Sequence, residues 1–385
     1  MPLSALRRGL FAAAFAATLA GPAAADIKGF NTAVRAGDYK TAAAEAEGIW
    51  KSWNTGDPQT ALMAREFGFA AFVSGRNDLA LQFGEFLVDQ GATLATPDDQ
   101  PATSAVLRRV AGYKMTGGEP ERQALRDALA ARSNASGLDM TSVLAWEVLY
   151  VADWNQGDWT NVEVDALAAA DFFKRAPENL QHRQRKAELT AAAAMFLQGR
   201  NRVTKGRNDY YDRMVDVHNA IVGDLNDAKS EGDRRLLWPL KWQAQAWSMA
   251  MWSYLTSSYE QVGSNISTKV QERPLAHPVR AQYPEDPASV HLPLCDGRFE
   301  GKKLSYPASK AYSGIVGGVI ARMEVAANGK VTDVELLAAV PSESFGESVI
   351  KTLKTWTFKP DKGADTSKCR LNSRNRMYSV TFRML

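Results

Sequence analysis

Hydrophobic and polar positions divide the chain into three stretches with different periods. Over residues 26–262 apolar residues recur at helical spacing, and alanine, leucine, glutamate and arginine dominate. Residues 271 to about 305 carry five prolines, which interrupt any helix and keep a chain extended. From residue 304 the period becomes that of strands. The pattern predicts an α+β protein with an all-helical domain (26–262), a proline-containing linker or extended arm (263–303) and a small C-terminal domain (304–385).

A recurring motif marks the predicted helix junctions: a glycine, then an aspartate, then an aromatic residue or leucine. The glycine ends one helix in a left-handed conformation, and the aspartate caps the next. The first two copies are 38 residues apart, close to the ~34 residues of tetratricopeptide repeats. The region resembles a tetratricopeptide-type solenoid of roughly four to six helix pairs, with an irregular helical bundle as the alternative. The copies are Gly37-Asp38-Tyr39, Gly75 to Leu79, Gly157-Asp158-Trp159 and Gly206 to Tyr210.

A hairpin opens the C-terminal domain. Residues 319–325 alternate between apolar and mostly charged side chains, which predicts a half-buried strand. Asn328-Gly329 is the strongest short hairpin signal, because both turn positions need positive φ. Residues 331–337 return as the second strand.

A helix and a third strand follow the hairpin. Ser344 and Glu347 fit a capping box, and an apolar stripe at helical spacing follows. The order in this domain is therefore strand, strand, helix, strand. In the last strand apolar positions alternate with polar ones, and these apolar positions are Tyr378, Val380, Phe382 and Met384.

The first 25 residues have the three parts of a secretory signal peptide. Arg7 and Arg8 precede an apolar run over residues 10–20, and Ala23-Ala24-Ala25 offers a small-residue cleavage site. The run is shorter than the ~20 residues of a membrane-spanning helix, so an uncleaved anchor is the less favoured alternative. These features predict export to the periplasm, cleavage near Ala25, and no integral membrane segment afterwards.

Composition and charge narrow the classes of partner. Hydrophobic residues make up 45% and charged residues 23%, which is globular rather than disordered composition. The formal charge of +3 falls to +1 without the signal peptide, which removes two arginines, so nucleic-acid binding is not implied. Positive charge gathers in the C-terminal domain, because from Glu300 onward basic residues exceed acidic ones by six.

The two cysteines, Cys295 and Cys369, both lie in the C-terminal part. In an oxidising periplasm an even pair predicts a disulfide, with two free buried thiols as the alternative. A bridge across a loop of about 75 residues would stabilise the fold by roughly 4 kcal/mol.

The sequence offers no pattern for catalysis, a cofactor or a metal. Its four histidines lack metal-binding spacing, and nucleophile-elbow, Walker and Rossmann glycine patterns are absent. We therefore expect no enzyme activity, no cofactor and no metal site. One aromatic cluster predicts either a groove for a peptide or glycan or, as the favoured interpretation, packed core; its members are Trp238, Trp242, Trp247, Trp252 and Tyr254.

From Tyr306 onward the sequence resembles the C-terminal domain family of TonB, the bacterial energy transducer. The resemblance covers about a fifth of the chain. It departs from the family pattern at Lys310, where alanine is common, and in a longer insertion that carries Cys369. The motifs that carry it are Tyr306-Pro307, Gly314 to Gly317, Asn328-Gly329, Trp356-Thr357-Phe358-Lys359-Pro360 and the last strand.

The resemblance implies a domain that binds an outer-membrane transporter by adding the transporter's strand to a sheet edge. It also implies that this edge is the last strand, residues 376–383. The candidate partner-binding residues are Arg374, Arg376, Tyr378, Val380 and Phe382. The arginines, with Arg370, either attract an acidic partner segment or keep a solvated edge from aggregating.

Two parts of a full TonB are replaced here. A leader with a cleavage site stands where TonB carries a membrane anchor, and a helical module stands in place of its long linker. We therefore expect a periplasmic adaptor rather than an energy transducer. Its solenoid would hold one partner, and its C-terminal domain would hold an outer-membrane transporter or another envelope protein. The alternative is a structural envelope scaffold whose solenoid binds peptidoglycan.

Overall fold

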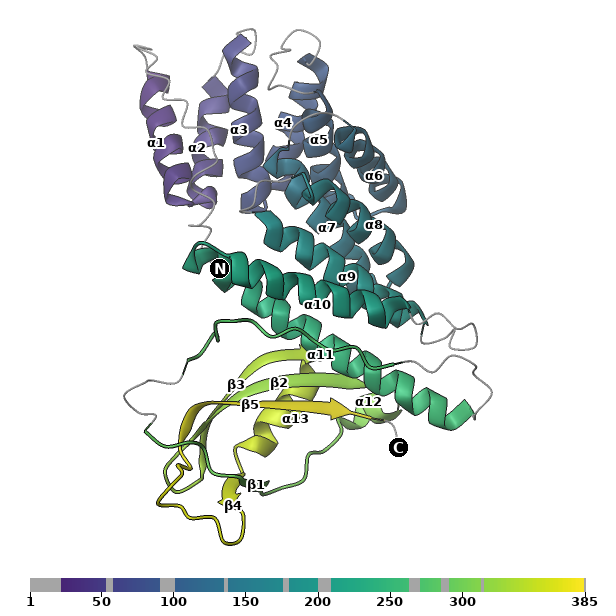
Figure 1. Ribbon diagram of the computed structural model, residues 1–385. Coiled ribbons are helices and arrows are strands. Elements are labelled where there is room, and N and C mark those ends of the chain that lie inside the picture. The colour runs from purple at the N-terminus through teal and green to yellow at the C-terminus, as the bar shows by residue number, and fades with distance from the viewer. Residues whose placement is uncertain are drawn as a thin grey trace. The chain divides into compact units, whose positions relative to one another are not determined.

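The computed structural model describes residues 22–52, 58–90, 101–134, 138–175, 180–199, 209–262, 271–284, 291–312 and 315–383. The chain forms two compact units, Met1–Gln184 and Arg185–Leu385 (Figure 1). Helices come first and a small sheet with its own helix comes last, so the α+β fold is confirmed. Most of the signal peptide lies outside the described residues. Ala23 to Ala25 fall in the first turn of α1 (Pro22–Ala36), and cleavage there stays a prediction.

The described residues of the first unit are helices and the turns between them. Each helix packs against its neighbours in sequence, which is the contact pattern of a helical solenoid. After α1 these helices are α2 (Tyr39–Ser52), α3 (Pro58–Ser74), α4 (Asn77–Gln90), α5 (Pro101–Thr116), α6 (Glu119–Ser133), α7 (Met140–Gln156) and α8 (Trp159–Phe173).

The predicted glycine turns end helices as expected. The backbone N–H of Thr41 donates to Asp38 at 3.1 Å, and that of Asn161 donates to Asp158 at 3.2 Å, so these aspartates cap α2 and α8. The turn glycines Gly37, Gly75 and Gly157 have φ of 75°, 85° and 74°.

The second junction differs from the prediction. Helix α4 begins at Asn77, so Asp78 lies inside the first turn and forms an ion pair with Arg76 at 3.0 Å instead of capping the helix. The glycine of the fourth junction, Gly206, lies outside the described residues, and α10 begins at Asp209.

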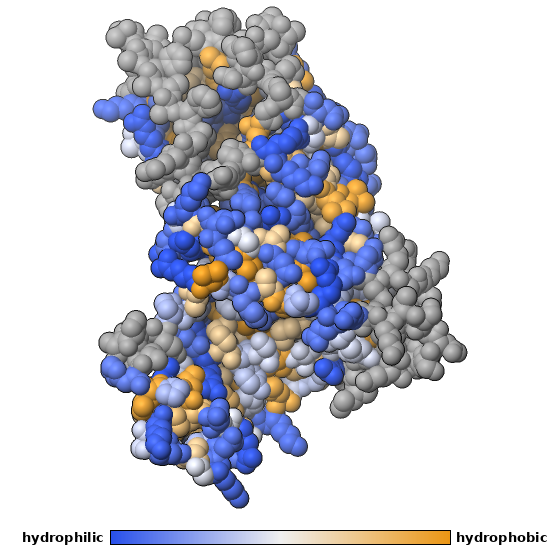
Figure 2. All heavy atoms as spheres, in the orientation of Figure 1, coloured by the Kyte–Doolittle hydropathy of each residue, from blue (hydrophilic) through white to orange (hydrophobic). Residues whose placement is uncertain are grey.

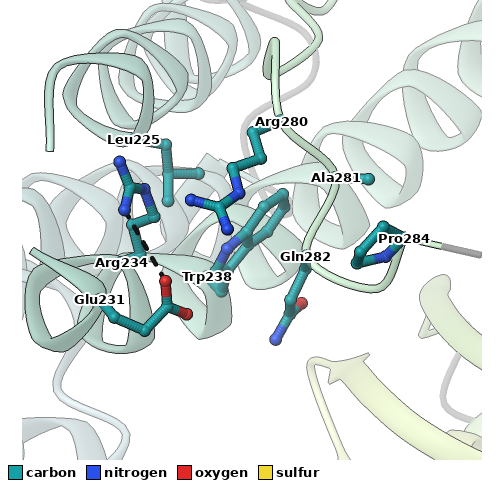
Figure 3. A pocket seen from close by; sticks show the side chains of 8 residues that line it. All are labelled: Leu225, Glu231, Arg234, Trp238, Arg280, Ala281, Gln282 and Pro284. Atoms are coloured by element: carbon teal, nitrogen blue, oxygen red, sulfur yellow. Dashed lines mark ion pairs between the residues drawn. The ribbon is translucent and has the colours of Figure 1, made fainter. Parts of the chain in front are cut away.

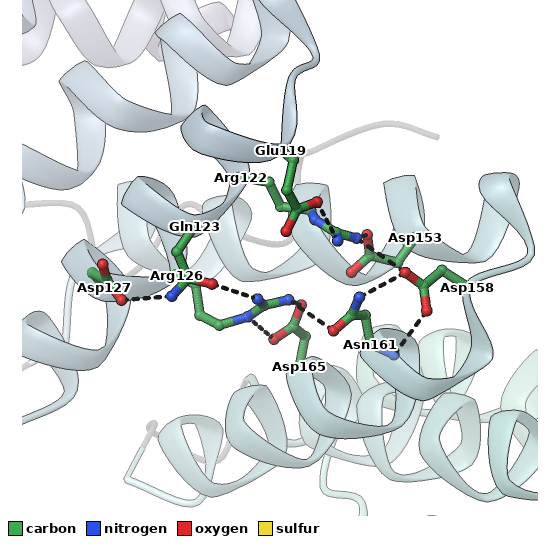
Figure 4. Close-up of polar contacts among 9 residues, drawn as sticks. All are labelled: Glu119, Arg122, Gln123, Arg126, Asp127, Asp153, Asp158, Asn161 and Asp165. Atoms are coloured by element: carbon green, nitrogen blue, oxygen red, sulfur yellow. Dashed lines mark hydrogen bonds and ion pairs between the residues drawn. The ribbon is translucent and has the colours of Figure 1, made fainter.

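A buried network of charges joins α6 to α7 and α8 (Figure 4). Arg126 donates to both carboxylate oxygens of Asp165, at 2.8 and 2.7 Å. Arg122 donates to the fully buried carboxylate of Asp153. Burial raises the pKa of Asp153 to about 6; Arg122 opposes the rise and the nearby carboxyl group of Asp165 adds to it.

The raised pKa of Asp153 makes stability depend on pH. The pKa of Asp153 is about 4 in the unfolded chain and about 6 in the folded one. Because the folded state binds its proton more tightly, the free energy of unfolding falls as pH rises through this interval. Relative to Asp153→Asn, the wild-type protein should lose about 1.4 kcal/mol per pH unit over this interval. Urea unfolding between pH 4 and pH 7.5 measures the difference. Asp171→Asn, on the exposed surface of α8, is the control, and a constant difference for Asp153→Asn would contradict the expectation.

The second unit joins helices to the sheet. It holds most of α9 (Gln181–Gly199), with α10 (Asp209–Asp227) and α11 (Glu231–Val262). The compact units thus divide earlier than the predicted end of the helical domain at residue 262. The reason is that α11 packs directly on strands of the sheet.

The C-terminal domain contains two small antiparallel sheets. Three strands have the order β3–β2–β5, with β2 (Gly317–Val325) between β3 (Val331–Val340) and β5 (Ser373–Phe382). A second pair, β1 (Gly297–Glu300) and β4 (Thr357–Pro360), was not predicted. The short helix α12 (Ala308–Tyr312) precedes β2, and α13 (Glu343–Leu353) follows β3.

Two adjacent glycines let helices approach both faces of the central strand. An added Cβ at Gly317 would lie 2.9 Å from the ring of Phe345 on α13. One at Gly318 would overlap the backbone carbonyl of Ala246 on α11.

Because α11 covers the second face of β2, Ile320 is only 1% exposed. The predicted alternation holds at Arg322 and Glu324, which are partly exposed between buried neighbours, and fails at Ile320.

The helix cap and the last strand also differ from expectation. The N-cap of α13 is Ser342, whose side chain accepts from the backbone N–H of Ser344, so Ser344 is not the cap. Strand β5 begins at Ser373, five residues before the first predicted apolar position, and Met384 lies outside the described residues.

The proline-containing segment forms an extended strap, residues 271–284, along α10. The backbone N–H of Ala276 donates to Asn219 at 2.8 Å, and that of Val279 donates to Asn226 at 2.9 Å. Seven helical residues advance about 10.5 Å, and three extended residues advance about 9–10 Å, so the two spacings match. Arg273 adds an ion pair with Asp216 at 2.6 Å.

The disulfide between Cys295 and Cys369 forms as predicted, with Cα atoms 4.9 Å apart. It ties the chain before β1 to the chain before β5. Backbone hydrogen bonds flank it, because Cys295 N–H donates to Arg370 O at 3.0 Å and Arg370 N–H donates to Pro293 O at 2.8 Å.

Loss of the disulfide should destabilise the second unit. It closes a loop spanning 74 residues, and the chain-entropy model gives roughly 4 kcal/mol for a loop of this size. We expect Cys295→Ser/Cys369→Ser to lower the free energy of unfolding by about this amount. Guanidinium unfolding with and without reductant measures it. Reductant should shift the wild-type transition only, and equal stability of oxidised and reduced protein would refute the expectation.

Hydrophilic residues dominate the described surface on the face shown in Figure 2, with hydrophobic residues scattered in small groups. Among the described residues the large hydrophobic side chains that are exposed come from several parts of the chain, and only Leu292 and Leu294 are close in sequence. The exposed side chains are Val88, Met115, Val151, Val164, Val279, Leu292, Leu294 and Met377.

Candidate partner-binding edge

Strand β5 lies at an edge of the three-stranded sheet. It pairs with β2 in antiparallel register from Gly317–Phe382 to Val325–Ser373. Within the described part of the chain, no strand pairs with its other side. An edge strand presents a row of backbone N–H and C=O groups that can template an incoming strand.

Alternate side chains of β5 point into the core of the domain. Val380 is opposite Val319 and 7% exposed, and Phe382 is opposite Gly317 and 5% exposed. The ring of Phe382 lies 4.9 Å from that of Phe345 on α13. These predicted binding residues therefore anchor the strand, and what they leave for a partner is their backbone.

Tyr378 and Arg376 lie in an aromatic cluster with the second sheet. The ring of Tyr378 lies 5.1 Å from that of Trp356, edge to face. The guanidinium of Arg376 lies 4.6 Å from the centre of the Phe358 ring. Trp356 in turn donates from its indole N–H to Lys302 O at 2.7 Å. The cluster fixes the middle of β5 against β4.

The arginines of the edge differ in their surroundings. Burial, with the nearby charge of Arg370, lowers the pKa of Arg376, whose side chain is half-buried. Arg374 is exposed, and its backbone carbonyl accepts from Arg322 at 3.2 Å. Arg383, at the other end, is also exposed. Arg374 and Arg383 therefore place exposed positive charges near the two ends of β5.

The opposite face of β5 is more open. Met377 is 39% exposed and Ser379 is exposed, while Thr381 is partly buried. These residues lie opposite Arg322, Ile320 and Gly318 of β2, on the face that α11 covers. A partner strand that extended the sheet would have its side chains beside these three positions.

The sequence analysis did not predict two features of this site, the pairing of β1 with β4 and the contact of β2 with α11. The pairing of β1 with β4 brings Phe299 to 5.7 Å from Trp356, and nothing in the short sequence Gly297 to Glu300 indicated a strand. The contact between β2 and α11 left one trace in the sequence, the second glycine of the pair Gly317-Gly318, which lies against Ala246 of α11.

The tryptophan-rich helix α11 is mostly core, as the favoured interpretation predicted. Trp238 is 5% exposed, and Trp247 and Tyr254 are also buried. Trp252 packs on Tyr211 of α10, with ring centres 5.4 Å apart.

Two searches of the described residues bear on other kinds of site. Their helices include none with the length and hydropathy that crossing a membrane requires. Those residues also contain no group of three or more His, Cys, Asp or Glu side chains placed to bind a metal ion.

Comparison with known proteins gives one match. No curated protein and no solved structure matches the chain. A family model described as Gram-negative bacterial TonB protein C-terminal matches residues 302–374, a span that includes β2, β3, α13 and β4 and the first residues of β5. This part of the chain, with its strand, strand, helix, strand core, is thus similar in sequence to the C-terminal domain of TonB proteins.

Proposed function

We propose that the chain is a periplasmic adaptor that binds a segment of an outer-membrane transporter as an added strand at the β5 edge. The observation that carries this proposal is the open side of β5 on a domain that is similar in sequence to the C-terminal domain of TonB proteins. The disulfide between Cys295 and Cys369 is in keeping with an oxidising compartment.

The geometry supports binding through the backbone. Main-chain hydrogen bonds supply affinity in strand addition, and alternate side chains supply selectivity. Val380 and Phe382 are committed to the core, so the strand is already extended and fixed before a partner arrives. A preorganised edge lowers the conformational entropy lost on binding.

Charge supports an acidic partner segment. From Glu300 to the end, basic residues exceed acidic ones by six. Arg374 and Arg383 place exposed charges near the two ends of β5. Such charges act mainly by raising the association rate, and their effect weakens with salt. The helical first unit would hold a second partner, which is what makes the protein an adaptor.

Photo-cross-linking at the edge tests the proposed site. With p-benzoylphenylalanine in place of Ser379, an exposed residue of β5, we expect covalent capture of an outer-membrane transporter in native envelopes, identified by mass spectrometry. The same group at Lys362, in the turn after β4, is the control. Val380→Pro in the cross-linking protein should abolish capture, because proline disturbs strand pairing, whereas Val380→Thr should retain it.

The fold of the Val380→Pro protein is checked by circular dichroism and by an intact disulfide. Capture that is equal from Ser379 and Lys362, or unchanged in the folded Val380→Pro protein, would contradict strand addition at β5.

Charge reversal tests the acidic character of the partner. Arg374→Glu with Arg383→Glu should slow association with the captured transporter by roughly tenfold at low salt, because it replaces attraction by repulsion at both ends of the strand. The effect should shrink above 0.3 M salt. Lys362→Glu, a charge reversal of the same kind away from β5, is the control. Association rates measured by surface plasmon resonance that do not distinguish the variants would show that these arginines only solvate the edge.

A further inference from the structure

A pocket in the second unit lies where the strap meets the ends of α10 and α11 (Figure 3). Its empty space, open solvent included, is about 380 Å³. Three segments that are distant in sequence contribute to it: Leu225 from α10, the first two turns of α11, and the last residues of the strap.

Two arginines line this pocket. In Figure 3 the guanidinium group of Arg280 lies beside the ring of Trp238, and that of Arg234, which lines the same pocket, is joined to Glu231 by an ion pair. Arg234 is anchored, because it donates to Ala228 O at 2.6 Å. Its acidic neighbour Glu231 is 3.7 Å away, beyond hydrogen-bond distance, and largely exposed.

Arg280 is exposed to solvent at the mouth of the pocket, and no ion pair is found for it among the residues that the structure describes. Both arginines line the pocket, and the planar fork of N–H donors of a guanidinium group fits a carboxylate. The positive charge of the pocket therefore exceeds what Glu231 supplies, and a carboxylate ligand would balance it.

The remaining lining is apolar or fixed in orientation. Leu225, Pro284 and the ring of Trp238 form apolar walls. The side chain of Gln282 accepts from the indole N–H of Trp242 at 2.6 Å and donates to the Tyr283 hydroxyl at 3.2 Å. Because the side-chain amide of Gln282 is held by two hydrogen bonds, little conformational entropy would be lost there when a ligand binds.

We infer that this pocket binds a carboxylate attached to an apolar group, with Arg234 and Arg280 on the carboxylate and Trp238 beside the apolar part. Two sources share this chemistry, a small free carboxylic acid and the C-terminal carboxylate of a peptide. The site is separate from the β5 edge and does not depend on the proposed function of that edge.

Calorimetric titration of the full chain tests the inference with matched probes. Benzoate is compared with benzamide, and the peptide Gly-Gly-Phe with its C-terminal amide. We expect at least one carboxylate to bind and its neutral partner to bind at least tenfold more weakly, since hydrogen bonds to a charged group are stronger than those to a neutral one. Binding of benzoate identifies a free acid as the source, and binding of the peptide alone identifies a peptide C-terminus.

Variants locate the binding. Arg280→Gln and Arg234→Gln should each weaken binding of the carboxylate about tenfold, for the same reason. Arg298→Gln, an exposed arginine on β1 paired with Glu300, is the matched control and should bind as the wild type does. The inference is overturned if neither carboxylate binds at 10 mM, if the amides bind equally well, if Arg280→Gln has no effect, or if inorganic phosphate binds more tightly than both carboxylates.

Discussion

The close approach of two helices to the central strand β2 is the contact on which the second unit depends. Gly317 gives Phe345 of α13 its place on one face, and Gly318 gives the backbone of α11 its place on the other. A side chain at Gly318 would push against a helix carbonyl, which cannot move without the whole helix, so the position is restricted to glycine. Burial of Ile320, Ala338 and Val340 follows from this contact.

That arrangement decides which part of the sheet remains for a partner. With both faces covered by helices, an incoming chain has only the edges. At the first residues of β3 the backbone is already engaged with β4, because Val331 N–H donates to Trp356 O at 3.1 Å and Phe358 N–H donates to Gly329 O at 2.7 Å. Strands β3 and β5 each have ten residues, so the contact with β4 shortens the open edge of β3 only at its beginning. Packing on the faces thus leaves the edges of the sheet, of which β5 is the candidate site.

Local signals in the sequence predicted where the helices and strands lie better than they predicted what those elements pack against. The hairpin, the helix that carries Phe345 and the alternation of Val380 and Phe382 depend on nearby residues and are confirmed. The turn differs from the prediction because, of Asn328 and Gly329, only Gly329 has positive φ, at 80°. The burial of Ile320 depends on a helix about seventy residues earlier, which no local period reveals. The pairing of β1 with β4 likewise depends on a distant partner. The N-cap was misplaced by two residues because Ser342 and Ser344 offer the same hydroxyl.

Because the side chains of Val380 and Phe382 point into the core, they are not available to select a partner at the edge. If a partner strand adds at this edge, as proposed, these side chains cannot contact it. Selectivity would then depend on Met377 and Ser379 and on the arginines at the two ends of the strand. The beginning of the strand is fixed by a chain of polar contacts. Tyr283 donates to Glu335 at 3.4 Å, Glu335 accepts from Arg322 at 2.7 Å, and Arg322 donates to the carbonyl of Arg374.

The same chain reaches the strap pocket, because Gln282 donates to Tyr283. A ligand that moved Gln282 would act on the carbonyl of Arg374, at the beginning of β5, and not on its middle, where Tyr378 is held by Trp356. Any coupling between pocket and edge would therefore change how far a partner strand can pair toward Ser373, while the register set by Val380 and Phe382 stays the same.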